Sequence, residues 1–103
     1  MKKIKELENH IHEEIEDAEC YTKLALLYKD DDPALARVYY DLGVQEIAHA
    51  DKLHESVVAA IDQYRREHGE PPEAMLAVYE YLHEREIEEA DEVKVLQAMF
   101  VKR

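Results

Sequence analysis

The sequence predicts an all-α protein, an antiparallel helical hairpin followed by a third helix. Two glycines and three prolines in 103 residues leave little room for the turns of a β fold. Apolar residues recur in steps of three and four, which is the spacing of one helical face. The chain is interrupted near residues 30–33 and 68–73, so we expect helices over about 3–29, 33–68 and 72–102 within a single domain, 1–103.

Both interruptions carry residues that end or begin helices. Asp32 can accept bonds from free helix N–H groups, and Pro33 suits the first helical position. Gly69 is a natural helix end, and Pro72 suits a restart. Short loops between long helices imply antiparallel neighbours. A four-helix site would therefore need a second chain, which predicts a homo-oligomer that is at least a dimer.

The charge balance excludes several classes of protein. The chain has 13 Lys and Arg against 25 Asp and Glu, a net charge of −12. Binding to nucleic acid or to anionic lipid needs clustered cations, so we expect neither partner. No stretch approaches the roughly 18 apolar residues of a membrane-spanning helix, and acids precede any apolar run at the N-terminus. We expect a cytoplasmic protein without a membrane segment.

The first two helices each interrupt an apolar stripe with polar residues. The stripe of the first contains Ile4, Leu7, Ile11, Ala18, Tyr21, Ala25 and Tyr28. Glu14 fills its one gap of seven residues. The stripe of the second contains Leu35, Val38, Leu42, Leu53, Val57, Ala60 and Tyr64. Glu46 and His49 occupy its missing positions and lie three residues apart, so they point the same way. We expect all three at the centre of the buried faces.

Carboxylates in an apolar seam point to a metal site. An uncompensated buried carboxylate costs several kcal/mol or takes up a proton, whereas a bound divalent cation keeps it ionised. Glu-x-x-His on one helical face with Glu from a facing helix is the ligand set for iron or manganese in a bundle. The primary metal ligands and candidate catalytic residues are therefore Glu14, Glu46 and His49.

The third helix carries further acids on its apolar face. Glu86 and Glu89 stand near the middle of that face, and His83 lies at its edge. The two glutamates are secondary candidate ligands, with a solvent-facing position as the alternative. Glu80-x-x-His83 repeats the spacing, but Glu80 lies off the stripe, which indicates a surface pair. We expect the other histidines to be solvated, namely His10, His12, His54 and His68.

Simpler interpretations exist for the remaining polar residues. Glu46 and His49 could be polar residues of a core or an interface without a metal. Tyr21 and Tyr39 lie on the seams, where they could pack, hydrogen-bond a ligand carboxylate or take part in redox chemistry. Cys20 is best explained as a small buried hydrophobic residue, and as the single cysteine it cannot form an intrachain disulfide.

These motifs resemble the ferritin-like di-iron superfamily. Glu14, followed by Tyr21 and later by Glu46-Ile-Ala-His49, is similar to the first half of rubrerythrins, and residues 13–21 are closer still to the encapsulated ferritins. The likeness covers roughly residues 10–57. It implies a di-iron centre shared by two chains, each giving one Glu and one Glu-x-x-His. Glu13 and Glu16 would match acids near the metal entry path, and Tyr21 the site tyrosine.

The resemblance implies a function with two alternatives. We expect a ferroxidase-type protein that oxidises Fe²⁺ with O₂ or peroxide, with manganese or zinc as substitute metals. One alternative is a helical oligomer, with or without metal, that serves as an interaction module through a second apolar face of the third helix. The other is a rubrerythrin-like peroxide reductase. We do not expect an encapsulin shell as a partner, because no targeting tail follows Val101.

Overall fold

The computed structural model describes residues 2–102 and contains three long helices in that range, with no strand. They are α1 (Lys2–Tyr28), α2 (Pro33–His68) and α3 (Glu73–Val101). The all-α prediction and the three predicted helices are confirmed, with ends that differ by one residue. Met1 and Arg103, the two ends of the predicted domain, lie outside the described residues.

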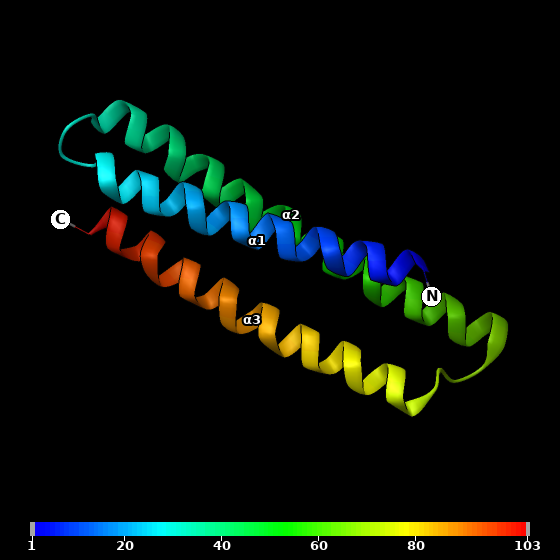
Figure 1. The fold of residues 1–103 in the computed structure, drawn as a ribbon. Helices are drawn as coiled ribbons and strands as arrows, with labels where there is room; N and C mark the ends of the chain where they lie inside the picture. The colour runs from blue at the N-terminus through cyan, green and yellow to red at the C-terminus, as the bar shows by residue number, and fades with distance from the viewer. Residues whose placement is uncertain (1, 103) are drawn as a thin grey trace.

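The helices form a narrow rod of 56 × 18 × 17 Å (Figure 1). α1 and α2 run antiparallel, and α3 returns in the direction of α1. The Asp32 side chain accepts a hydrogen bond of 3.2 Å from the Leu35 N–H at the start of α2. Gly69 ends α2 with a positive φ of 82°, and its N–H donates to the Arg65 carbonyl at 3.0 Å. Both capping predictions are confirmed.

The core lies mainly between α1 and α2. Its buried members are Ile4, Ile11, Ile15, Ala18, Ile47, Ala50, Val57 and Val93. Ile15, Ile47 and Ala50 occupy the places that the sequence interpretation gave to Glu14, Glu46 and His49. Glu14 and Glu46 instead lie half-buried beside the core, and His49 is exposed. The expectation that the candidate ligands lie at the centre of the buried faces was wrong. α1 and α2 each carry two apolar stripes that are one residue apart, and the packing buries the stripe that contains the isoleucine.

α3 is held less firmly than the hairpin. Val93 is its single fully buried residue among those described. Near the end of α3, the ammonium of Lys29, which directly follows α1, donates to the Lys102 carbonyl at 2.8 Å and lies 5.6 Å from the centre of the Phe100 ring. α3 exposes Tyr81, Ile87, Val95 and Met99, which belong to the second apolar face expected for the third helix, while Leu76 of that face is half-buried.

Two other expectations concern the surface. Cys20 is exposed, so its interpretation as a buried hydrophobic residue was wrong. It follows Glu19 on the flank of α1, outside the line of Ile15, Ala18 and Thr22 that faces α2. Among residues 2–102, no helix combines the length and the apolar character that a membrane crossing requires.

Candidate metal centre

Three side chains predicted as primary ligands converge on the seam between α1 and α2. Glu14 comes from the middle of α1, while Glu46 and His49 come from successive turns of α2. One potential ligand atom from each lies within 4.8 Å of the other two. This is close enough for one ion to contact all three after small side-chain adjustments. The convergence was predictable because Glu46 and His49 share a helical face and α1 faces it.

The group is partly shielded from solvent. His49 Nδ1 lies 3.5 Å from Glu14 Oε2 and 3.9 Å from Glu46 Oε1. The side chains of Glu14 and Glu46 are 26% and 19% exposed, whereas that of His49 is 56% exposed. Glu14 Oε2 is hidden from solvent and accepts no hydrogen bond within the described chain. A half-buried carboxylate oxygen without a donor favours a cation as its partner.

The chemistry of the donor set suits a transition metal of intermediate hardness. Two carboxylates and one imidazole are ligands of iron, manganese and zinc in proteins. Three donors leave coordination positions open, and the His49 side chain gives the group a solvent-exposed side. Within one chain, the group can therefore bind an ion while leaving sites for water, for substrate or for a second chain.

A stack of tyrosines occupies the same seam toward the loop between α1 and α2. The rings of Tyr21 and Tyr39 are 6.2 Å apart and nearly parallel, and Tyr28 continues the stack at 6.2 Å from Tyr39. Tyr21 follows Glu14 by two helical turns, and Tyr39 precedes Glu46 by two turns. Tyr21 therefore packs where the sequence placed it, in line with the ligand group.

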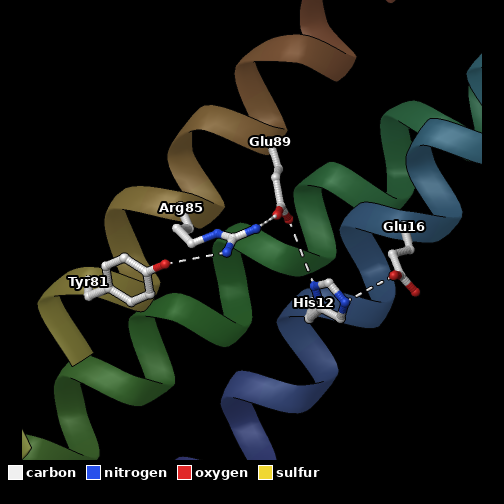
Figure 2. Close-up of polar contacts among 5 residues, drawn as sticks. All are labelled: His12, Glu16, Tyr81, Arg85 and Glu89. Atoms are coloured by element: carbon white, nitrogen blue, oxygen red, sulfur yellow. Dashed lines mark hydrogen bonds and ion pairs between the residues drawn. The ribbon is translucent and has the colours of Figure 1, made fainter. Parts of the chain in front are cut away.

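Four other candidate ligands do not join the group of three. Glu13 and Glu16 have side chains that are 68% and 65% exposed. Figure 2 shows that His12 links Glu16, at 2.9 Å, to Glu89 of α3, at 3.8 Å. Glu89 also pairs with Arg85 at 3.4 Å. Glu13 lies 3.7 Å from His10 Nδ1. Glu13, Glu16 and Glu89 thus contact histidine or arginine instead of the group of three.

Glu86 lies at a separate place, where the three helices meet. Burial raises the pKa of Glu86 to about 9, and the neighbouring Glu8 carboxyl, which favours the protonated form, acts in the same direction. Both residues line one cavity between α1 and α3. The folded environment therefore favours the protonated form of Glu86. Glu8 was not singled out in the sequence, because it stands beside Leu7 on the flank of the predicted stripe.

The expectation that His54 is solvated was wrong. His54 is half-buried, and its ring stacks on that of His83, with 4.1 Å between centres and 8° between planes. The sequence signal was present, since His54 lies seven residues after the buried Ile47 on one face of α2. The sequence did not predict which residue of α3 contacts that face, because this depends on how α3 packs against the hairpin. His10, His12 and His68 are exposed, as predicted.

Comparison of the chain with protein-family models, with curated proteins and with solved structures found no match.

Proposed function

We propose that this chain is a ferritin-like di-iron protein that binds Fe²⁺ and oxidises it with O₂ or peroxide. The observation that carries the proposal is the convergence of Glu14, Glu46 and His49 within 4.8 Å of one another. Their partial burial matters as much as their proximity, because exposed acidic groups come together often without binding a metal. Here two carboxylates are mostly shielded, and one oxygen lacks a hydrogen-bond donor.

The site is completed in this proposal by a second copy of the chain. One chain offers two carboxylates and one imidazole, too few to hold two ions in a closed shell. Two chains related by a two-fold axis would offer four carboxylates and two imidazoles around one centre. The open side of the group, marked by the exposed His49, is where the partner's ligands would enter.

The charge of the protein supports cation delivery. A net charge of −12 creates a negative potential that raises the local concentration of divalent cations. Fe²⁺ is the substrate, and two Fe²⁺ ions give two electrons to one O₂, which with two protons becomes H₂O₂ while two Fe³⁺ form. Carboxylates favour this direction because oxygen donors bind the harder Fe³⁺ more strongly.

The test is anaerobic loading with Fe²⁺ followed by exposure to oxygen, with ferric absorption recorded against time. We expect oxidation much faster than in buffer, and a loss of at least about 10-fold in rate in Glu46→Ala, because each ligand holds the ion in place. Glu92→Ala is the matched control, since Glu92 is exposed on α3. An oxidation rate no greater than that of buffer, or equal in both variants, contradicts the proposal.

The second candidate function is a helical oligomer that acts as an interaction module. It is favoured by the exposed apolar residues on α3, which are Val78, Tyr81, Ile87, Val95 and Met99. Thermal melting with and without Mn²⁺ separates the two functions. The di-iron proposal expects a melting temperature that rises with metal and falls back in Glu46→Ala. A melting temperature indifferent to metal favours the interaction module.

A further inference from the structure

A second group of metal-binding side chains lies where all three helices meet. It consists of Glu8 from α1, His54 from α2, and His83 and Glu86 from α3, here called the junction cluster. A cavity of about 110 Å³ is lined by His54, His83 and Glu86, and a neighbouring cavity is lined by Glu8 and the same two histidines. Glu14, Glu46 and His49 line neither of these cavities.

The imidazole of His54 stacks on that of His83, and this environment favours its neutral form. Parallel rings 4.1 Å apart cannot both carry a positive charge without strong repulsion. Burial lowers the pKa of His54, and the neighbouring His83 acts in the same direction. A neutral imidazole has a free lone pair on one ring nitrogen, which is the metal-binding form.

The two carboxyl groups of the cluster lack a cation. Glu86 Oε1 is hidden from solvent and has no hydrogen-bond partner in the described chain. No Lys or Arg among residues 2–102 forms an ion pair with Glu8 or Glu86. The nearest arginine in sequence, Arg85, is turned toward Tyr81 and Glu89 (Figure 2). Either a proton or a bound cation must neutralise this pair.

We infer that Glu8, His54, His83 and Glu86 form a second divalent-cation site that joins α3 to the hairpin. Two imidazole nitrogens and two carboxylate oxygens suit a four-coordinate ion such as Zn²⁺. Among residues 2–102, Glu14, Glu46 and His49 are the group whose ligand atoms all lie within 4.8 Å of one another, and no three residues of the junction cluster come this close. Binding at the junction cluster therefore requires the imidazoles to turn out of their stack toward Glu86.

An ion bound at the junction cluster would hold α3 against the hairpin of α1 and α2. α3 has Val93 as its single fully buried residue in the described range, so few apolar contacts hold it. An ion bound to one residue of α1, one of α2 and two of α3 would link all three helices. The inference does not depend on the proposed ferroxidase function, since it uses none of its ligands.

The test uses a protein in which the first site is disabled by Glu46→Ala and His49→Ala. Zn²⁺ is titrated by calorimetry, and Co²⁺ is used as a probe whose visible absorption reports tetrahedral binding. We expect one ion per chain, and an affinity lower by at least about 10-fold when His83→Ala or Glu86→Gln is added. His68→Ala is the matched control, because His68 is exposed near the end of α2 and lies outside the cluster.

A second measurement separates ligand loss from misfolding. Zn²⁺ should slow amide hydrogen exchange in α3 around residues 83–86, and this slowing should vanish in Glu86→Gln, which keeps the size of the side chain. The inference is overturned if the double variant binds no Zn²⁺, or if His83→Ala and His68→Ala bind it equally. In that case a proton alone neutralises Glu8 and Glu86.

Discussion

Glu86 is the residue whose charge depends most on the fold. Its carboxyl group is half-buried between α1 and α3, and burial is the main cause of its raised pKa, with Glu8 and Glu89 adding to it. An unfolded chain would lose this proton near the ordinary value of 4.5, whereas the folded chain keeps it up to about 9. The folded state therefore binds more protons than the unfolded state across that interval.

The first prediction concerns the pH dependence of stability in metal-free buffer. The contribution of Glu86 is fully present below pH 4.5 and is lost as pH rises through about 9, so the free energy of unfolding falls over this range. Solvent screening of a half-buried group limits the effect to the order of 1 kcal/mol between pH 5 and pH 8. Urea unfolding of the wild type and Glu86→Gln should show a smaller pH slope in the variant. Equal slopes would contradict the assignment.

At the scale of the element, the close approach of α1 and α2 depends on Gly43. A Cβ placed there would lie 2.7 Å from Thr22 Oγ1 and 3.3 Å from the Ala18 carbonyl. Thr22 cannot move away freely, because its hydroxyl donates to that same carbonyl at 2.7 Å and the residue is fully buried. Glycine is used here for lack of space, since its backbone is ordinary helix.

The second prediction is that Gly43→Ala destabilises the protein by about 1–3 kcal/mol, although alanine favours helix by about 1 kcal/mol. Denaturant unfolding measures the loss. Adding Thr22→Ala to this variant removes the atom at 2.7 Å and should recover part of the stability, which a double-mutant cycle would record as coupling. If the two substitutions are additive, the steric explanation is wrong.

At the scale of the whole molecule, the chain is a thin rod, and the group of Glu14, Glu46 and His49 is open to solvent on the side of His49. Its radius of gyration is 16.5 Å, and α3 lies along one side of the hairpin (Figure 1). A rod of three helices exposes much apolar surface, including Val38 and Leu27 near the tyrosine stack. Pairing of two rods would cover such surface and complete the ligand set at the same time.

The third prediction is that metal drives this pairing. Mn²⁺, which does not react with oxygen as Fe²⁺ does, should at least double the mass measured by sedimentation, and Glu46→Ala should weaken this response by at least about 10-fold in metal concentration. Glu92→Ala should respond like the wild type. A chain that remains monomeric at every Mn²⁺ concentration would contradict a metal centre shared by two chains. Binding of Mn²⁺ by a single chain would then be measured by a separate titration.

The local sequence was sufficient to predict the three helices and the loops between them. Asp32, Gly69 and the spacing of apolar residues act over a few neighbouring residues, so their effect can be read without knowing the packing. The same locality made the pair of Glu46 and His49 predictable. The packing of the helices against one another was needed to establish that Ile15 lies in the core while Glu14 lies beside it, and that His54 stacks on His83. It was also needed to establish that Glu86 lines a cavity that Glu14 does not line. These choices depend on the rotation of each helix about its axis, which is set by the summed packing of distant residues.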